Sequence, residues 1–185
     1  MSKIIDGIKI SNEIKMEISN TISMAIDKGH RPPSLKIVLV GGHGPSRIYV
    51  NAKMKACEVV GIDAELITLN DNIKQENLSD LINKLNRDND VDGFIVQLPL
   101  PENISIQKVI EDIHPSKDVD GFTNVNIGSI TSTKKKLMPA TGLGVMTLIE
   151  RYAIDIESKK CVVIGSSRNV GGAIAQMLVQ REDVT

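Results

Sequence analysis

The sequence predicts an α/β protein with a parallel sheet covered by helices on both faces. Short apolar runs rich in β-branched residues, such as "LKIVLVG" at 35–41, alternate with amphipathic segments of helical period. An almost wholly apolar run is typical of a strand that is buried on both faces. Further along, "CVVIGSSRNVGG" at 161–172 has the form strand, glycine-rich loop and helix, which indicates the start of a second unit.

The N-terminal segment is predicted to be an amphipathic helix. Isoleucines recur at every fourth position from 10 to 26, and mostly polar residues fill the positions between them. Such spacing follows one face of a helix. Ser11 is expected to cap the start of this helix, and Gly29 is expected to end it.

Six further elements alternate in type after the first helix. The patterns predict strands at 35–41, 63–69 and 91–101 and helices at 46–60, 77–88 and 105–113. Strands that alternate with helices form a parallel sheet with helices on both sides. Ligands of such sheets bind beyond the carboxyl ends of the strands. The loops after Val40 and Val96, and the loop at 117–126, are therefore the candidate positions for a site.

A change of pattern near 139–144 predicts a second domain. The segment "LGVMTLIERYAI" is expected to be a connecting helix, and the unit at 161–172 follows it. The final residues "QREDVT" are similar to the start of another strand. Because a dinucleotide fold needs more strands than these, the second unit is expected to be incomplete. We therefore predict domains at 1–140 and 141–185.

The composition excludes several classes of function. Hydrophobic residues make up 41% of the 185 residues and charged residues 24%, as in globular proteins. The net charge is −1 and aromatic residues are only 2%, so we expect no nucleic-acid partner. The one dense basic run, at 134–136, is interpreted as a solvated loop. No apolar run approaches membrane-spanning length and the N-terminus has no signal core, so we expect no membrane contact.

The two cysteines predict neither a metal site nor a disulfide framework. Cys57 and Cys161 are not part of any C-x-x-C pair. Both lie in apolar segments and are expected to be buried thiols. Unpaired cysteines fit a reducing compartment, so we expect a cytoplasmic protein.

Tyr49 and Lys53 form a Tyr-x-x-x-Lys pair on the helix at 46–60. Residues four apart share one helix face, and Lys53 lies on the less polar side. A partly desolvated lysine has an accessible neutral amine, which suits acid/base chemistry. The alternative is a lysine that extends along apolar surface to water, with Tyr49 as ordinary packing. A short-chain dehydrogenase is disfavoured, because its glycine-rich loop precedes the Tyr-Lys pair, whereas the candidate loop here is at 165–171.

Polar residues also lie at two later strand ends. Gln97 is expected to face the ligand crevice, beside a stiff apolar wall at 98–101 that suits a flat aromatic ligand. Asp118 and Asp120 precede Gly121, but the further ligands of a calcium loop are missing, so we reject that interpretation. A carboxylate in this loop can accept hydrogen bonds from an amino-pyrimidine edge. The alternative is a simple Asp-Gly turn.

The loop "GSSRNVGG" at 165–172 predicts a nucleotide site of modest specificity. Small residues allow backbone N–H groups to approach a pyrophosphate at the start of the next helix. The spacing is not G-x-G-x-x-G, so a tight strand-helix turn without a ligand stays open.

Together these motifs resemble the bifunctional methylenetetrahydrofolate dehydrogenase/methenyltetrahydrofolate cyclohydrolase family. Four segments carry the resemblance in order: "VGGHGPSRIYVNAKMKACEVVGI", "DGFIVQLPLP", "PSKDVDGFTNVNIG" and "VVIGSSRNVGG". The resemblance implies a three-layer α/β folate-binding domain at 1–140. It implies that 141–185 holds a connecting helix and the start of a Rossmann-like NAD(P)-binding domain, C-terminally truncated.

The resemblance also implies two activities. One is oxidation of 5,10-methylenetetrahydrofolate to the methenyl form with NADP or NAD. The other is hydrolysis of 5,10-methenyltetrahydrofolate to 10-formyltetrahydrofolate. A homodimer that serves one-carbon metabolism and purine biosynthesis is implied as well.

The roles of single residues follow from the same resemblance. Lys53 matches the catalytic lysine, a general acid/base; Gln97 is implied to hold it and Asp120 to bind the pterin. The implied catalytic residues are Lys53, Tyr49, Gln97 and Asp120. The implied substrate-binding residues are Tyr49, Lys53, Val96, Gln97, Leu98 and Asp120. The implied cofactor-binding residues are Thr141, Gly165, Ser166, Ser167, Arg168 and Gly171.

Two departures from the family pattern bear on these roles. Ser166 stands where the family commonly has an arginine that can bind the 2′-phosphate of NADP, although Arg168 is close by. NADP is therefore the expected cofactor, and NAD is the alternative. The junction at 139–144 lacks the family's second proline, which frees the backbone there. The alternative functions are a folate- or nucleotide-binding chain without full dehydrogenase turnover, and a plain structural domain.

Overall fold

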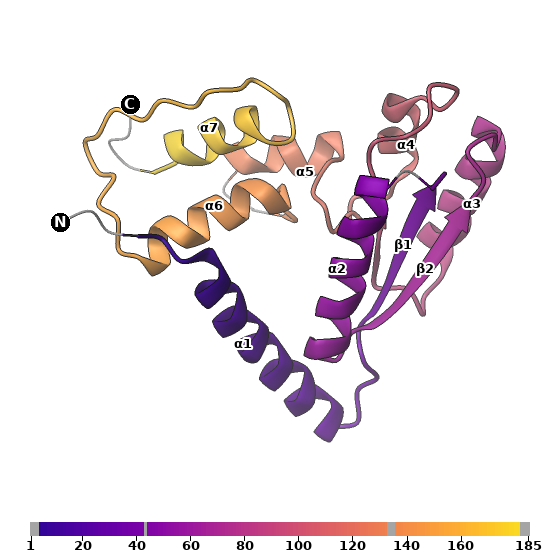
Figure 1. Cartoon of the computed structure of the whole chain (residues 1–185), viewed down its shortest axis with the longest axis horizontal. Helices are drawn as coiled ribbons and strands as arrows, with labels where there is room; N and C mark the ends of the chain where they lie inside the picture. Colours follow the sequence, from indigo (N-terminus) through magenta and orange to yellow (C-terminus); the bar gives the residue numbers. More distant parts are fainter. Residues whose placement is uncertain (1–3, 43, 133–135, 182–185) are drawn as a thin grey trace. The chain divides into compact units, whose positions relative to one another are not determined.

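The computed structural model describes residues 4–42, 44–132 and 136–181, and Figure 1 shows their path. Lys134 and Lys135 of the predicted basic loop lie outside these ranges, as does the predicted strand start after Arg181. Within the described ranges, every helix is too short or too polar to cross a membrane.

The described residues fall into two compact units. One unit holds 12–117, and the other combines the residues up to Ser11 with those from Asp118 onward. The chain thus passes from one unit to the other after Ser11 and passes back after Lys117. The predicted domains at 1–140 and 141–185 stay a prediction.

The unit at 12–117 is built around a parallel sheet. Its strands are β1 (Ser34–Val40), β2 (Asp63–Leu69) and β3 (Gly93–Val96), in the order β2-β1-β3. Both neighbours of β1 run parallel to it. The predicted parallel sheet is confirmed. The third strand is shorter than predicted, because Pro99 and Pro101 have no N–H group to donate to a neighbour.

Helices cover both faces of this sheet (Figure 1). α2 (Gly44–Val60) packs on one face, and α3 (Gln75–Arg87) and α4 (Ile106–Asp112) pack on the other. Each of the three helices was predicted within two residues at either end. The predicted three-layer α/β arrangement is therefore present in this unit.

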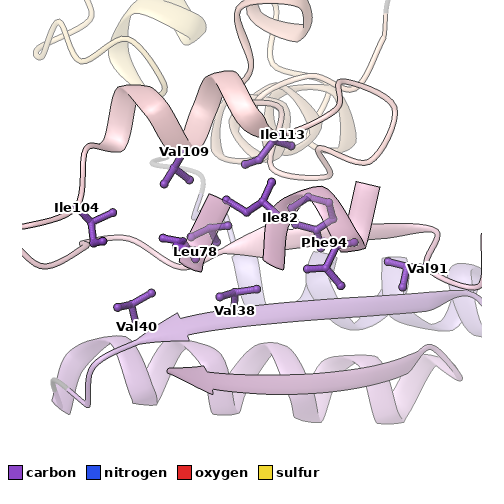
Figure 2. Close-up of a cluster of buried hydrophobic side chains, with 11 residues drawn as sticks. Val38, Val40, Leu78, Ile82, Val91, Phe94, Ile104, Val109 and Ile113 are labelled. Carbon is purple, nitrogen blue, oxygen red and sulfur yellow. The ribbon is translucent and has the colours of Figure 1, made fainter. Parts of the chain in front are cut away.

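The two cores follow from the alternation of side chains along β1. Ile37 and Leu39 point to one face and pack with Val50 of α2. Side chains from the other face of β1 join α3, β3 and α4 in the cluster that Figure 2 shows. Its buried members are Val38, Val40, Leu78, Ile82, Leu85, Val91, Phe94, Val96, Ile104, Val109 and Ile113. Burial of this apolar surface holds the strand ends in fixed positions.

The N-terminal helix α1 (Gly7–Asp27) begins before its predicted cap. Ile10 and Ile22 are buried, but Ile18 and Ile26 are exposed. Residues four apart on a helix advance by about 40° per step, so five of them in a row cannot all face one side. The predicted apolar stripe is therefore only partly buried.

The regular elements that the structure describes from Asp118 onward are helices. It contains α5 (Asn124–Gly128), a single 3₁₀ turn η1 (Ser129–Thr131), α6 (Ala140–Arg151) and α7 (Gly171–Val179). Its buried core residues are Ile127, Ile130, Met146, Ala173, Met177 and Leu178. The short helix α5 was not predicted, and the connecting helix α6 begins three residues earlier than expected.

The strand predicted at the start of 161–172 does not form. In the described part of the chain the segment is irregular, and Val162 and Ile164 are 85% and 98% exposed. Cys161 is half-buried rather than buried, which corrects a second expectation. A β-strand needs a hydrogen-bonded neighbour, and the described residues contain none beside this segment.

Candidate active site

Two of the predicted site residues meet at the carboxyl end of the sheet. Lys53 lies in the middle of α2, and Gln97 directly follows β3. The Lys53 Nζ donates a hydrogen bond to the Gln97 Oε1, with 3.1 Å between the two atoms. Both side chains are half-buried, so the pair is shielded on one side and open on the other. The structure thus brings together residues that are 44 positions apart.

Gln97 is held at three points. Its backbone N–H donates to the carbonyl of Val38 at 2.9 Å, which extends the pairing between β1 and β3 by one residue. Its side-chain Nε2 donates to the carbonyl of Leu98 at 2.6 Å. Because the Nε2 is used in this way, the Oε1 must face Lys53. The amide therefore presents an acceptor, and not a donor, to the lysine.

Tyr49 lies one helical turn before Lys53 and is 64% exposed. Its ring is therefore accessible to a ligand over Lys53, which is the position expected from the spacing of four residues. Cys57 lies one turn after Lys53 and is buried, as predicted. Burial raises the pKa of the Cys57 thiol, and the positive charge of Lys53 opposes that effect. Cys57 is thus a neutral packing residue of the helix.

A depression of about 720 Å³ lies beside the strand end that carries Gln97. Its lining consists of Asp71, Asn72, Pro99, Leu100, Pro101, Glu102 and Asn103. Three of these belong to the apolar wall predicted at 98–101. Part of the wall therefore borders this depression, but Lys53 and Gln97 do not belong to its lining.

Asp118 and Asp120 belong to the other unit and have different surroundings. Asp118 is 2% exposed, and its carboxylate accepts hydrogen bonds from the N–H groups of Phe122 and Thr123. Asp120 is half-buried, and its carbonyl accepts a hydrogen bond from the N–H of Ala140 at 3.2 Å. Asp118 is thus bonded within the loop through its carboxylate, and Asp120 is held there through its backbone carbonyl.

The predicted nucleotide loop folds tightly although its strand is absent. Gly165 has φ of 125°, and a Cβ on Gly171 would lie 2.1 Å from the carbonyl oxygen of Gly165. Only glycine fits that contact. The carbonyl of Ser167 accepts the N–H of Gly172 at 2.9 Å, and its hydroxyl accepts the N–H of Gly171 at 3.4 Å. Ser166 and Thr141, both predicted to bind cofactor, are exposed.

Arg168 of this loop hydrogen-bonds to the side chain of Asn124, the first residue of α5. Sequence reasoning did not identify Asn124, nor Thr123 and Asn126, which shape the same region. A signal for them was present, because Thr123 is a standard N-cap type and its Oγ1 accepts the N–H of Asn126. The described ranges contain no group of three or more histidine, cysteine, aspartate or glutamate side chains that could hold a metal ion.

Comparisons with known proteins match both halves of the chain. Residues 5–120 match the family model for the tetrahydrofolate dehydrogenase/cyclohydrolase catalytic domain. Residues 139–185 match the model for the NAD(P)-binding domain of the same family. The two matches leave out residues 1–4 and 121–138.

Individual curated proteins are also similar to this chain in sequence. The bifunctional protein FolD of Porphyromonas gingivalis is 45% identical over 179 residues, which is 97% of this chain and 60% of that protein. The protein of the same name from Bacteroides thetaiotaomicron is 44% identical over 178 residues, or 96% of this chain and 61% of that protein. The chain thus spans about three fifths of the length of these relatives.

Solved structures agree with this picture. The bifunctional FolD dehydrogenase/cyclohydrolase of Campylobacter jejuni has a TM-score of 0.94 at 41% identity, covering 99% of this chain and 65% of that one. The dehydrogenase-cyclohydrolase of Trypanosoma brucei, complexed with NADP and an inhibitor, has a TM-score of 0.93 at 28% identity, covering 100% and 63%.

Proposed function

Because the chain belongs to the tetrahydrofolate dehydrogenase/cyclohydrolase family, we propose that it acts on one-carbon derivatives of tetrahydrofolate. The first reaction is oxidation of 5,10-methylenetetrahydrofolate to the methenyl form. The second is hydrolysis of the methenyl form to 10-formyltetrahydrofolate. The observation that carries the proposal is the hydrogen bond between Lys53 and Gln97 at the carboxyl end of the sheet.

Lys53 is the general acid/base of the hydrolysis. Its neutral amine accepts a proton from the water that attacks the one-carbon bridge and returns it to the ring nitrogen as the bond from that nitrogen to the bridge breaks. The hydroxyl that was added loses its own proton to solvent as the formyl C=O forms. A base must lie within reach of that water, and the fixed Gln97 Oε1 restricts where the Lys53 Nζ points. Because the Gln97 amide is neutral, it orients the lysine without forming an ion pair with it.

The remaining folate contacts are assigned to Tyr49, Val96, Leu98 and Asp120. Tyr49 offers an exposed aromatic face for the ring system of the substrate. The backbones of Val96 and Leu98 border the same strand end. Asp120 accepts hydrogen bonds from the amino-pyrimidine edge of the pterin, which presents N–H and NH₂ donors. These assignments are supported by the resemblance and by the exposure of Tyr49.

The loop at 165–171 is assigned to NAD(P). Gly165, Ser166 and Ser167 are exposed and small, so a pyrophosphate can approach their backbone, and the residues fit such a group. When bound, NAD(P) supplies the hydride acceptor. Thr141 and Gly171 complete the proposed set. We assign NADP as the cofactor on the strength of the resemblance. NAD is the alternative, because Ser166 carries no charge to bind a 2′-phosphate and Arg168 already contacts Asn124.

The wider setting is proposed from the same resemblance. We assign 1–140 to the catalytic domain and 141–185 to the start of the NAD(P)-binding domain. The chain is proposed to act in the cytoplasm as a homodimer, within one-carbon metabolism and purine biosynthesis.

One alternative is favoured by a specific observation. The segment at 161–164 forms no strand in the described structure, so the nucleotide loop has no sheet behind it. A chain that binds folate and lacks dehydrogenase turnover would fit this feature. The hydrolysis site does not depend on that segment, because Lys53 and Gln97 are fixed within residues 12–117.

Two assays with the same chain separate these functions. In the first, 5,10-methylenetetrahydrofolate is mixed with NADP or NAD, and formation of the reduced nucleotide is followed. In the second, 5,10-methenyltetrahydrofolate is added alone, and its decay is compared with decay in buffer. Activity in both supports the full proposal, and activity in the second alone supports a hydrolase without dehydrogenase turnover. Folate binding without either activity would contradict the proposal and favour the alternative.

A further inference from the structure

The buried carboxylate of Asp118 has no role in the proposed chemistry, yet it is one of the most thoroughly bonded groups in the molecule. It is 2% exposed and lies at the entry of the loop that carries Asp120. A buried carboxylate is costly unless hydrogen bonds replace its hydration. The nature of those bonds therefore indicates what the group is for.

Among the described residues, the carboxylate of Asp118 bonds to the exit of its own loop. Its Oδ1 accepts the N–H of Phe122 at 3.1 Å, and its Oδ2 accepts the N–H of Thr123 at 2.7 Å. The Oδ2 also accepts the side-chain Nδ2 of Asn126 at 2.9 Å, and Asn126 is fully buried. The entry and the exit of the loop are thus joined through one carboxylate, and Asp120 lies between them.

The remaining backbone of the loop is fixed as well. The N–H of Gly121 donates to the carbonyl of Asp118 at 3.2 Å, which closes a tight turn around Asp120. Gly121 has φ of 70°, and a Cβ there would lie 2.4 Å from the carbonyl carbon of Met138. The N–H of Ala140 donates to the carbonyl of Asp120 at 3.2 Å. Asp120 is therefore held from both sides along the chain and from across it.

We infer that Asp118 is a positioning residue that sets the place of the Asp120 carboxylate for the pterin, an inference that rests on the proposed function of Asp120. A binding carboxylate is most effective when its loop is ordered before the ligand arrives. Charged hydrogen bonds to backbone N–H groups are strong enough to order such a loop. Asp118 acts through Asp120 and does not itself touch the ligand.

The test is a double-mutant cycle on ligand binding. The dissociation constant of 5-formyltetrahydrofolate, a stable tetrahydrofolate derivative, is measured for the unmodified chain, Asp118→Asn, Asp120→Ala and the double variant. Asp118→Asn keeps the shape but turns an N–H donor toward donors in the loop. We expect it to weaken binding about tenfold in the unmodified chain. In the Asp120→Ala background we expect less than about a twofold effect, because the group that Asp118 positions is gone.

Thr123→Val is the matched control. It removes the side-chain cap of α5, the Thr123 Oγ1 bond to the Asn126 N–H, in the same loop exit, but it leaves the carboxylate of Asp118 with its donors. We expect it to change ligand binding less than about twofold, because the loss of the cap affects α5 and the bonds that hold the loop around Asp120 remain. If Asp118→Asn fails to fold, Asn126→Ala replaces it in the cycle, because that change removes a single donor to the carboxylate.

The outcomes distinguish failure of the positioning role of Asp118 from failure of the proposed function of Asp120. Equal weakening by Asp118→Asn in both backgrounds, or no weakening in either, overturns the positioning role while Asp120 keeps its own. No effect of Asp120→Ala, or no binding by the unmodified chain, overturns the proposed function of Asp120 and the inference with it. Loss in the Thr123→Val control equal to that in Asp118→Asn would show that general loosening of the loop is sufficient, and it overturns the inference too.

Discussion

At the scale of single residues, the candidate site depends on which way one amide faces. Gln97 donates from Nε2 to the carbonyl of Leu98 and accepts at Oε1 from Lys53. An amide held in this way fixes the lysine without a charge. A carboxylate in its place would bind the lysine more tightly and a methyl group not at all.

Removal of this amide is the first test at the residue scale. We expect Gln97→Leu to lower the rate of methenyltetrahydrofolate hydrolysis about 10- to 100-fold, because Lys53 loses its orienting acceptor. The free energy of unfolding should change little, because the position is half-buried and leucine fills the same volume. Gln107→Leu on α4 serves as the control, since Gln107 is exposed and hydrogen-bonds to Glu111 one helical turn later. A Gln97→Leu variant with full activity would contradict the assigned role.

A second residue-scale prediction concerns pH. Arg31 hydrogen-bonds to the Asp92 carboxylate, and the N–H of Ser34 adds a further bond. These contacts lower the pKa of Asp92 below its usual value. The resulting stabilisation is complete above the unfolded value of about 3.9 and is lost as the pH falls through the lower folded value.

We therefore expect Asp92→Asn to lower the free energy of unfolding by about 0.5–1 kcal/mol at neutral pH, because the pair is about half exposed. The difference between the two proteins should shrink as the pH falls below about 4. Urea titrations of both proteins at several pH values measure it. A difference that stays constant down to the acid limit would show that the charge of Asp92 is not its source.

At the scale of elements, the loop between α4 and α5 depends on one glycine. Gly121 adopts φ of 70°, and a Cβ there would clash with the backbone of Met138. We expect Gly121→Ala to lower the free energy of unfolding by more than about 2 kcal/mol, because strain and collision add. Gly128→Ala is the matched control, because a Cβ at Gly128 meets nothing within 4 Å. Thermal unfolding of the two variants should differ clearly, and equal stability would contradict the account of the loop.

The elements also show which parts of the fold were predictable. β1 and β2 were predicted within one residue. The apolar run of β1, the central strand, is mostly buried, whereas the edge strand β2 alternates between exposed and partly buried side chains over most of its length. The helix α5 has five residues and too short a pattern to show a period. The isoleucine repeat of α1 was interpreted as one stripe, although a four-residue spacing turns around the helix. Local patterns predicted elements well, and predicted their burial less well.

The candidate site was predictable in part for the same reason. Lys53 and Gln97 come from different elements. The helix face that carries Lys53 and the strand end that carries Gln97 predicted that both side chains face one crevice, and the structure joins them by a hydrogen bond. The orientation of the Gln97 amide and the bonds of Asp118 depend on tertiary contacts. No pattern in the sequence encodes those contacts directly.

At the scale of the whole molecule, the two units differ in whether their apolar β-rich segments have hydrogen-bonded neighbours. β1 lies between two hydrogen-bonded neighbours, whereas the apolar segment at 161–164 has none in the described structure. Amide hydrogens exchange slowly where backbone bonds are buried and rapidly where they face water. We expect strong protection of the amides at 37–40 and little at 162–164. Comparable protection of both segments, measured by hydrogen exchange, would show that 162–164 is paired in solution.

The central claim for the molecule is that Lys53, oriented by Gln97 within residues 12–117, is the general acid/base of the hydrolysis. The most direct measurement is the decay of 5,10-methenyltetrahydrofolate absorbance in the presence of the chain, its Lys53→Met variant and its Lys55→Met variant. Lys55 is exposed on the same helix, so its variant controls for loss of a charge. We expect decay above buffer for the unmodified chain and for Lys55→Met, and a loss of at least about 100-fold for Lys53→Met. Equal decay with Lys53→Met in a folded sample would contradict the claim.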